Sequence, residues 1–389
     1  MKPLIKWPGG KTSELSQFTW LIPDHDRYIE PFVGGGALFF YLNPENALIN
    51  DNSEDLMLFY ELVKDQDAAF NRILNLYARS FSALQEECER CYQDLHTLYR
   101  LFLFAQENGL DLVRLNVHKE LVRRIAMSME DLGELVPDEE AYLVQMEKAV
   151  LDKILRTVKI DQKRPMSEKD LMANLVTGFT GGYYLYFRDV FNQLASGRMI
   201  GSKQYRVANF YFIREYCYGS MFRYNAAGEF NIPYGGISYN KKDFAGKVAR
   251  IFDRDTAALL DRTQLFCEDF EEMLNGLDLT ERDFLFLDPP YDTEFSDYEG
   301  RSFTREDQKR LASFLERTPA RFLLVIKNTD FIYSLYEGKF RILAFENKYL
   351  YNVRSRNERK SEHLLVTNVP EQEVPWIREN INLQGNDYA

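Results

Sequence analysis

The apolar run Phe284-Leu285-Phe286-Leu287 leads directly into Asp288-Pro289-Pro290-Tyr291, and this junction constrains the fold more than any other feature. Four consecutive large apolar residues predict a strand buried on both faces, as in a mostly parallel sheet. The prolines fix φ and remove two N–H donors, so the strand ends in a stiff loop that presents carbonyl acceptors. Because open α/β sheets bind ligands at such strand ends, we expect Asp288, the Pro289 carbonyl and Tyr291 to hold a planar ring and its exocyclic amine. The alternative is a proline turn without a ligand.

Composition places the chain among large globular proteins. Its 389 residues, 45% of them hydrophobic, predict one large domain with an insertion, or two domains. No apolar run approaches the ~20 residues of a membrane span, and the N-terminus lacks the apolar stretch of a signal peptide. The cysteines are scattered apart from Cys88 and Cys91, which have no second pair or histidine cluster near them. We therefore expect a cytoplasmic protein with neither a membrane anchor nor a metal site.

Charge is spread unevenly along the sequence. The formal net charge of −12 argues against indiscriminate nucleic-acid binding. Bases nevertheless outnumber acids by seven to three between Arg198 and Asp243 and by seven to two between Lys339 and Lys360, whereas Phe81 to Ile160 is net acidic. Any surface that faces a nucleic acid is therefore expected to be local. A solvated basic face without a partner is the alternative for each cluster taken alone.

Short apolar runs alternate with helical patterns near both ends of the chain. This alternation predicts an α/β fold with a doubly wound, mostly parallel sheet. Asn52 is expected to cap the helix after the second strand, and Thr304-Arg305-Glu306-Asp307 to begin a later helix through a capping box. The expected strands lie at 28–31, 47–49, 264–267, 284–287, 322–326, 341–345 and 362–367.

The middle of the chain departs from this pattern twice. Residues 65–174 have apolar residues at helical spacing and hardly any glycine, which predicts a helical insertion. Its acidity favours a protein partner or self-association over a DNA contact, and decoration of the core is the alternative. From Gly178 to Asn240, Gly, Tyr, Phe, Asn and Arg with weak periodicity are typical of a loop-rich recognition module. The aromatic residues from Tyr183 to Phe191 are expected to form its core rather than a surface on which bases stack.

A glycine-rich stretch, Glu30-Pro31-Phe32-Val33-Gly34-Gly35-Gly36, follows the first expected strand and opens a helix. Glycines there allow the backbone to approach a ligand closely, and Phe32 can pack on that ligand. The stretch does not fit a dinucleotide fingerprint, because Phe39 stands where the third glycine is needed. Gly10-Lys11-Thr12 does not end a phosphate-binding loop, because Ile5 stands at the required first glycine. The chain is therefore expected to bind neither NAD nor ATP phosphates in those ways.

Two acidic residues at strand ends complete a nucleoside site. Asp51 ends the second strand, where a carboxylate can accept both hydroxyls of a ribose. Asp269-Phe270 follows the strand at 264–267, where it can bond to and pack on an adenine. With the glycines, these residues describe an adenosine pocket without a pyrophosphate site, which fits S-adenosylmethionine. A turn or a helix cap is the alternative for each acid taken alone.

Five blocks follow one another along the chain: Lys6-Trp7-Pro8-Gly9-Gly10-Lys11, Glu30 to Gly36, Asn50-Asp51-Asn52, Phe222-Arg223-Tyr224-Asn225 with Gly228-Glu229-Phe230-Asn231-Ile232-Pro233, and Asp288 to Tyr291. Through these blocks and their order, the chain resembles the Dam-type DNA adenine-N6 methyltransferases. They span nearly the whole chain except about 65–170, and Glu362-His363-Leu364-Leu365 is similar to the family's closing segment. The resemblance implies a class I methyltransferase, Rossmann-like catalytic domain over 1–64 and 246–389, a helical insertion over 65–174, which small members lack, and a DNA target-recognition domain over 175–245.

The resemblance, added to the reasoning above, implies roles for single residues. Gly219-Ser220 replaces the Asn-Gly pair of the closest family members, which leaves the target sequence open. Arg223 would read a base, and Tyr218 lies near an intercalating position. The residues expected to contact double-stranded DNA are Tyr218, Arg223, Asn225, Arg354, Arg356 and Lys360. The catalytic residues would be Asp288, Pro289, Pro290 and Tyr291. The contacts to S-adenosylmethionine would be Trp7, Lys11, Glu30, Phe32, Gly34, Gly36, Asp51, Asp269, Phe270 and Asp288.

The expected reaction is methyl transfer from S-adenosylmethionine to the N6 amine of an adenine flipped out of the duplex. Hydrogen bonds from that amine to Asp288 and the Pro289 carbonyl would make its lone pair available, while Tyr291 stacks on the base. Methylation of cytosine N4 or of an RNA adenine, and a silent DNA-binding protein, are the alternatives. A protein-glutamine methyltransferase is less favoured, because those carry Asn at the first position of the loop. Oligomeric state and biological setting, whether solitary, paired with a restriction enzyme or phage-borne, stay open.

Overall fold

The computed structural model describes residues 1–114, 116–129, 132–221, 223–291, 297–298, 301–347 and 361–374. The chain divides into two compact units. Met1–Asp65 and Asp253–Ala389 form one, here called the sheet unit, and Gln66–Phe252 form the other, the helical unit. The helical unit is thus inserted into the sequence of the sheet unit. In the described parts of the chain, no helix is both long and apolar enough to cross a membrane.

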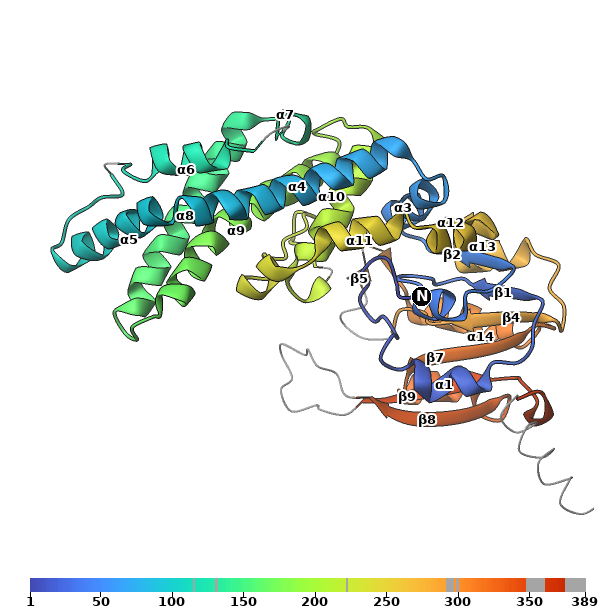
Figure 1. Ribbon diagram of the computed structural model, residues 1–389. Helices are drawn as coiled ribbons and strands as arrows, with labels where there is room; N and C mark the ends of the chain where they lie inside the picture. Colours follow the sequence, from blue (N-terminus) through green and yellow to red (C-terminus); the bar gives the residue numbers. More distant parts are fainter. Residues whose placement is uncertain are drawn as a thin grey trace, which may run out of the picture. The chain divides into compact units, whose positions relative to one another are not determined.

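The sheet unit is built on a mostly parallel sheet, which confirms the predicted fold class (Figure 1). The strands of this sheet are β1 (Arg27–Glu30), β2 (Ala47–Asn50), β3 (Thr263–Phe266), β4 (Asp283–Leu287), β7 (Arg321–Lys327), β8 (Arg341–Asn347) and β9 (Ser361–Thr367). Within the described residues it has seven strands in the order β3-β2-β1-β4-β7-β9-β8. The neighbouring strands β3, β2, β1, β4 and β7 are parallel to one another, and β9 is antiparallel to both of its neighbours, β7 and β8. The order reverses between β1 and β4, so the ligand site of such a sheet is expected beyond their carboxyl ends.

Helices pack on both faces of this sheet. The helices and 3-10 turns of the sheet unit are α1 (Leu15–Phe18), η1 (Thr19–Leu21), α2 (Ala37–Leu42), α3 (Glu54–Lys64), α12 (Arg254–Asp261), α13 (Phe270–Asn275), α14 (Arg305–Leu315), α15 (Asp330–Tyr336) and η4 (Glu371–Glu373). Two further short strands, β5 (Asp297–Tyr298) and β6 (Arg301–Ser302), pair with each other in antiparallel orientation. On one face, α13, α14 and α15 share a core with Ile29 of β1 and Leu285 of β4. Successive strand residues point to opposite faces, and Phe286 of β4 accordingly stacks on Phe18 of α1. The sheet is therefore doubly wound.

Two predicted helix starts have different outcomes. Thr304 caps α14 as predicted: its hydroxyl accepts the N–H of Asp307, whose carboxylate accepts the N–H of Thr304. The predicted cap of α3 at Asn52 is wrong. Ser53 caps this helix instead, because its extended backbone directs the hydroxyl at the N–H of Leu56 in the first turn.

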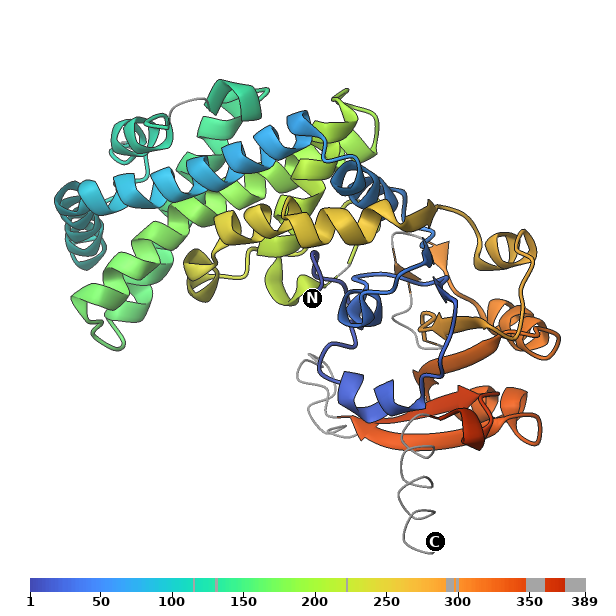
Figure 2. The same ribbon diagram turned by 45° about the vertical axis from the view of Figure 1, so that its right-hand side comes forward.

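The helices of the helical unit differ widely in length. They are α4 (Ala68–Arg90), α5 (Tyr92–Glu107), α6 (Lys119–Ala126), α7 (Leu132–Leu135), α8 (Glu139–Asp161), α9 (Glu168–Ala195), α10 (Lys203–Tyr216) and α11 (Phe244–Ile251), with 3-10 turns η2 (Tyr218–Ser220) and η3 (Ile237–Lys241). α4, α8 and α9 lie side by side (Figures 1 and 2). The two ends of the unit meet, because the ring centroid of Phe70 in α4 lies 5.9 Å from that of Phe252.

The loop-rich interpretation of residues 178–240 is wrong for its first part, which α9 and α10 largely occupy. A longer irregular segment begins only at Cys217. Two of the glycines in this first part, Gly178 and Gly182, lie where α9 packs closely on α8. A Cβ on Gly182 would lie 2.8 Å from Sδ of Met146, which is too close for a real contact. Glycine therefore serves a helix contact here and not a turn.

We expect Gly182→Ala to destabilise the helical unit by about 1–3 kcal/mol. Its Cβ would also lie 3.1 Å from Cβ of Ala149, so α8 and α9 would have to separate. Gly133→Ala is the matched control, because Gly133 lies in α7 and a Cβ there meets nothing within 4 Å. Alanine at that position should be neutral or stabilise by up to about 1 kcal/mol. Chemical denaturation measures both variants, and equal stabilities would contradict the close-contact role of Gly182.

The aromatic run of α9 forms core, as predicted. The Tyr183 hydroxyl lies 2.6 Å from that of Ser80, and its ring packs against Phe187. The sequence places the boundary between the helical insertion and the recognition domain at residue 175, and α9 continues across this position without a break. The division into these two domains stays a prediction. The buried residues of the run are Tyr183, Tyr184, Tyr186, Phe187 and Phe191.

Candidate active site

The loop after β4 carries the residues predicted to be catalytic. Asp288 directly follows the buried strand, and its carboxylate lies 2.8 Å from Nζ of Lys11. Lys11 is only 2% exposed, and its ammonium also donates to the Gly9 carbonyl. The same ammonium lies 5.1 Å from the ring centroid of Tyr291. One buried cation therefore contacts both ends of the loop, through an ion pair at Asp288 and a cation–π contact at Tyr291.

The ionisation of Asp288 depends on Lys11. Removal of the carboxylate from water raises its pKa, and this is the largest influence on it. The charge of Lys11 and the hydrogen bond from it lower the pKa of Asp288 in opposition. Lys11 is thus the group that keeps this carboxylate able to accept hydrogen bonds.

A neutral histidine packs behind Tyr291. The ring centroids of Tyr291 and His363 of β9 lie 5.5 Å apart, and Nδ1 of His363 lies 3.9 Å from the carboxylate of Glu14. Burial, followed by the charges of Lys11 and Lys327, lowers the pKa of His363 to about 4. The imidazole is therefore uncharged at neutral pH and adds no second cation to the loop that Lys11 holds.

α14 supports the same loop. Gln308 is fully buried, and its Nε2 donates to the Pro290 carbonyl over 2.9 Å. The bonded carbonyl is not that of Pro289, which the sequence assigns to the target amine. The loop is thus held at Asp288 by the ammonium group of Lys11 and at Pro290 by the side-chain amide of Gln308.

The glycine loop after β1 is packed by Trp7. Gly34 and Gly36 have φ values of 48° and 66°, which favour glycine. A Cβ on Gly34 would lie 2.6 Å from Cδ1 of Trp7, and the Tyr60 hydroxyl donates to the Gly34 carbonyl. The sequence predicts that a ligand approaches the glycines closely. At Gly34 the group that makes this close approach is Trp7, itself a predicted cofactor contact.

Asp51 follows β2 and is bonded to this glycine loop. Its carboxylate accepts the N–H groups of Gly34 and Ser53, each over 3.0 Å. Removal from water raises the pKa of Asp51 to about 6, against the opposing effect of the backbone bonds from Ser53, Gly34 and Asn52. Because a carboxylate has about four acceptor positions, others remain for donors such as hydroxyls.

Glu30 brings a third carboxyl group to the same strand ends. It is buried, and it accepts a hydrogen bond from the Tyr28 hydroxyl over 2.8 Å. Burial raises the pKa of Glu30 well above its usual value, the bond from Tyr28 lowers it, and the charges of Asp288 and Asp51 raise it further. The three predicted acids therefore influence one another electrostatically at the ends of β1, β2 and β4.

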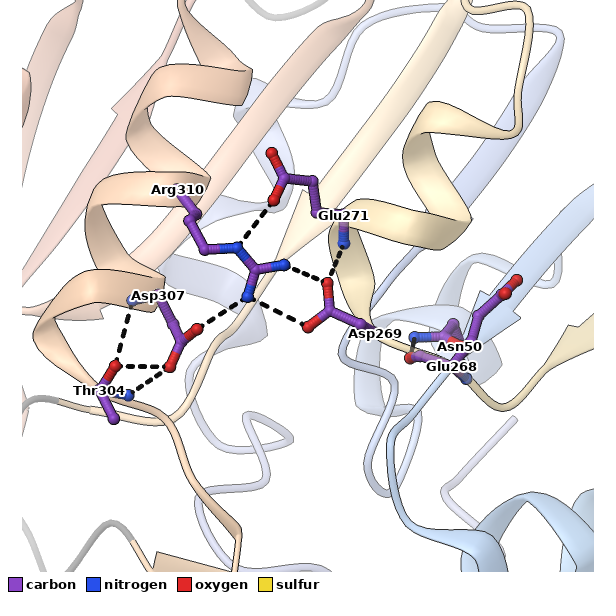
Figure 3. Close-up of polar contacts among 7 residues, drawn as sticks. All are labelled: Asn50, Glu268, Asp269, Glu271, Thr304, Asp307 and Arg310. Carbon is purple, nitrogen blue, oxygen red and sulfur yellow. Dashed lines mark hydrogen bonds and ion pairs between the residues drawn. The ribbon is translucent and has the colours of Figure 1, made fainter.

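Asn50, the last residue of β2, is hydrogen-bonded to the segments that directly follow the neighbouring strands β1 and β3. Its Nδ2 donates to the carbonyls of Pro31 and Glu268, both over 3.0 Å. Its Oδ1 accepts the N–H of Glu268. These bonds fix the turn after β3, where Asp269-Phe270 begins α13 (Figure 3).

Asp269 is held by an arginine of α14. Its carboxylate accepts the N–H of Glu271 and two nitrogens of Arg310, the nearer at 2.5 Å. Arg310 also pairs with Glu271 over 2.7 Å and with Asp307 over 2.8 Å (Figure 3). Hydrogen bonds to Asp269 and Glu271 raise the pKa of Arg310. Asp269 thus has a structural partner, Arg310, in addition to any role in binding a ligand.

Three aromatic rings gather next to this network. The ring centroids of Phe32 and Phe270 lie 5.3 Å apart, and Phe303 packs edge-on to Phe32. The Arg310 guanidinium lies 5.0 Å from the centroid of Phe270. The structure therefore brings Phe32, Asp269 and Phe270 together, although they come from the ends of different strands.

The predicted DNA contacts that the structure describes lie after α10. Tyr218 is 42% exposed in η2, and the buried Arg214 supports this turn by donating to the carbonyls of Ser220 and Met221. Arg223 is exposed, and its Nε donates to Asn231. Arg354, Arg356 and Lys360 fall outside the described residues.

Asn225 is engaged in a turn. Its side-chain oxygen accepts the N–H groups of Ala227 and Glu229, and Gly228 completes the turn with a φ of 74°. Tyr224 and Phe230 bridge on either side of it. Asn225 therefore shapes the exposed tip that follows Arg223.

Sequence reasoning missed Gln308, Arg310 and His363. A signal for Gln308 was present, because it shares a helix face with Leu311 and Leu315, three and seven residues further on, where a polar residue is unexpected. His363 interrupts an apolar strand in the same manner. Nothing in the pattern of α14 marks Arg310, since only Asp307 among its acidic partners lies in the same helix, and Asp269 and Glu271 lie at the start of α13.

Comparison with known proteins identifies the family. The family model of the D12 class N6 adenine-specific DNA methyltransferases matches residues 7–125 and 125–351. The chain is 25% identical to the type II methyltransferase M.CviBI of Paramecium bursaria Chlorella virus NC1A, over 95% of this chain and 100% of the relative. It is 27% identical to the type II methyltransferase M.MjaIII of Methanocaldococcus jannaschii, over 87% of this chain and 89% of the relative. It is 22% identical to a DNA adenine methylase of Vibrio cholerae, over 87% and 85% of the two chains. The chain therefore belongs to the D12 class of DNA methyltransferases, which are specific for the N6 position of adenine.

Proposed function

We propose that this DNA adenine methyltransferase takes its methyl group from S-adenosylmethionine, bound beyond the carboxyl ends of β1, β2 and β3. It acts on an adenine flipped out of double-stranded DNA into the loop Asp288-Pro289-Pro290-Tyr291. The observation that carries the proposal is the buried Lys11, which holds Asp288 and Tyr291 at the point where the strand order reverses.

The residues at these strand ends fit the donor. Asp51 has acceptor positions left for the ribose hydroxyls. Phe32 is half-buried and offers an apolar face for the adenine, with the buried ring of Phe270 packed against it. Trp7, Lys11, Glu30, Gly34, Gly36, Asp269 and Asp288 surround the same strand ends and complete the proposed contacts. S-adenosylmethionine would supply a methyl group already activated by its sulfonium charge.

The loop residues act on the acceptor. The Asp288 carboxylate and the Pro289 carbonyl accept the two hydrogens of the adenine amine, which favours a lone pair directed at the donor. Tyr291 stacks on the base and offsets part of the few kcal/mol needed to flip it. Pro289 and Pro290 keep the acceptors in place before the base arrives, so little reorganisation is needed.

The DNA side of the proposal involves the segment after α10. Tyr218 at the exposed η2 turn would insert next to the target, and Arg223 would read a base edge in the major groove. Asn225 would shape the tip that follows. Phosphate contacts, including those proposed for Arg354, Arg356 and Lys360, would supply affinity without sequence preference.

We expect the affinity for S-adenosylmethionine to fall as the pH drops through about 6. The pKa of Asp51 is raised to about 6, so below that pH its carboxyl group becomes protonated and loses acceptor capacity toward the ribose. Calorimetric titration at several pH values measures this dependence. Asp51→Asn is the control, since its weaker binding should no longer vary with pH in this range. A wild-type affinity that is constant across the range would contradict the role of Asp51.

The test of the proposed function is transfer of labelled methyl groups from S-adenosylmethionine to unmethylated genomic DNA, followed by base-resolved sequencing. Label in N6-methyladenine at one sequence motif supports the proposal and supplies the target sequence. A wild-type protein that neither binds S-adenosylmethionine nor labels DNA would overturn it.

A further inference from the structure

We propose that α14 positions both halves of the active site through two residues, Gln308 for the acceptor loop and Arg310 for the adenosine side of the donor site. The inference rests on the proposed function, which places the acceptor at Asp288 to Tyr291 and the adenosine beside Phe270. Both are positioning residues, because each acts through the group that it holds and not on a reacting atom.

Gln308 sets the direction in which Tyr291 leaves the loop. The proline ring already fixes φ of Pro290, and the peptide that follows is planar. The bond from Nε2 of Gln308 to the Pro290 carbonyl fixes the remaining rotation, which is ψ of Pro290. A fully buried polar side chain on an apolar helix face is unfavourable unless it is bonded. The Nε2 of Gln308 finds an acceptor in the Pro290 carbonyl, whereas its Oε1 has no hydrogen-bond partner among the described residues.

Arg310 holds the turn that presents Phe270. It pairs with Asp269 and Glu271 (Figure 3), which flank Phe270 at the start of α13. Its guanidinium also lies against the Phe270 ring. It also pairs with Asp307 of its own helix. Without Arg310, three carboxylates would face one another, and their repulsion would open the turn.

The two residues reach different parts of the site from one rigid element. They are two residues apart and hence about 200° apart around the helix. The capping box of Thr304 and Asp307 fixes the start of α14. Loss of either side chain should therefore disturb one half of the site and leave the other in place, which general unfolding of the helix would not do.

For the acceptor half, Gln308→Leu should lower kcat by about 10- to 100-fold, because a misplaced reacting group costs rates of this order. Its Kd for S-adenosylmethionine should stay within about twofold of wild type, which also reports an intact fold. Gln308→Glu adds a readout that a merely structural role would not move. Its activity relative to wild type should rise as the pH falls from about 8 to about 6, because a protonated carboxyl group can donate to the Pro290 carbonyl again. For Gln308→Leu the same ratio should stay constant.

For the donor half, Arg310→Gln should weaken binding of S-adenosylmethionine by roughly tenfold while kcat at saturating donor stays within about twofold. Lys309→Gln is the matched control between the two positions. Lys309 is exposed and pairs with Glu306 one turn away, so neither parameter should change by more than about twofold.

The outcomes separate this inference from the proposed function. A wild-type protein that fails to bind S-adenosylmethionine or to methylate adenine removes the proposed function itself. A functional wild type with the opposed changes in kcat and Kd supports the positioning roles. If both variants change the two parameters alike, or if Gln308→Glu shows no pH-dependent recovery, the inference is overturned.

Discussion

Replacing Asp288 by alanine is expected to lower the rate of methyl transfer by about 1,000-fold or more, since one preorganised acceptor at a reacting centre contributes on this order. The variant loses the carboxylate that accepts the target amine and also leaves Lys11 buried without its ion pair. Single-turnover transfer to DNA at saturating donor measures the loss directly.

The controls for this prediction use the chemistry of the same position. Asp288→Asn keeps one acceptor oxygen and removes the charge, so its rate should lie between those of the alanine variant and wild type. Both variants leave the buried Lys11 without its ion pair, so both should lower the temperature of thermal unfolding by a similar amount, and a difference in rate between them reports the acceptor oxygen. A turnover within tenfold of wild type for Asp288→Ala, at unchanged donor affinity, would refute the acceptor role.

Lys11→Met should move the acid limb of the kcat profile to higher pH and lower activity at neutral pH by about 10- to 100-fold. Burial raises the pKa of Asp288 and Lys11 lowers it, so without Lys11 that pKa rises further. The reactive form is the ionised carboxylate, which then exists only at higher pH. Activity should consequently recover as the pH is increased.

The pH profile distinguishes this effect from loss of structure. Lys11→Arg keeps the charge and should keep the acid limb near its wild-type position, even if its larger head group reduces kcat. A uniform loss across the pH range in Lys11→Met, with no shift of the limb, would show that Lys11 supports the loop without controlling Asp288. Rates measured from about pH 6 to about pH 10 cover the relevant range.

The parts of the fold that the sequence predicted well are those governed by local composition. β4 and β7 are recognisable because burial on both faces demands uninterrupted apolar residues. The start of α14 is recognisable because a capping box involves residues only three apart. The position of the Asp288 loop directly after β4 was predictable for the same reason, because the strand and the loop are contiguous in the sequence.

The parts that were missed depend on partners distant in sequence. Gly182 looks like a loop residue until α8 is placed against it, and only then is its lack of a side chain explained. Asp269 suggested a free carboxylate, but Arg310, from another element, pairs with it. Ser53 replaced Asn52 as a cap because neighbouring polar residues have similar preferences and local geometry decides between them.

The contact between Phe70 and Phe252 has a consequence for the order of folding. β2 and β3 are neighbours in the sheet although the whole helical unit separates them in sequence, and a disordered connection of that length would make their pairing slow. During synthesis the helical unit emerges before β3 and β4, and domains generally fold as units from the N-terminal side. Once the helical unit has folded, its two ends lie together. The segment that must be ordered for β2 to pair with β3 is then effectively short, and its loop-closure entropy is small. The inserted helical unit thus delays completion of the candidate active site until the C-terminal strands are synthesised. It adds little to the entropy cost of pairing β2 with β3.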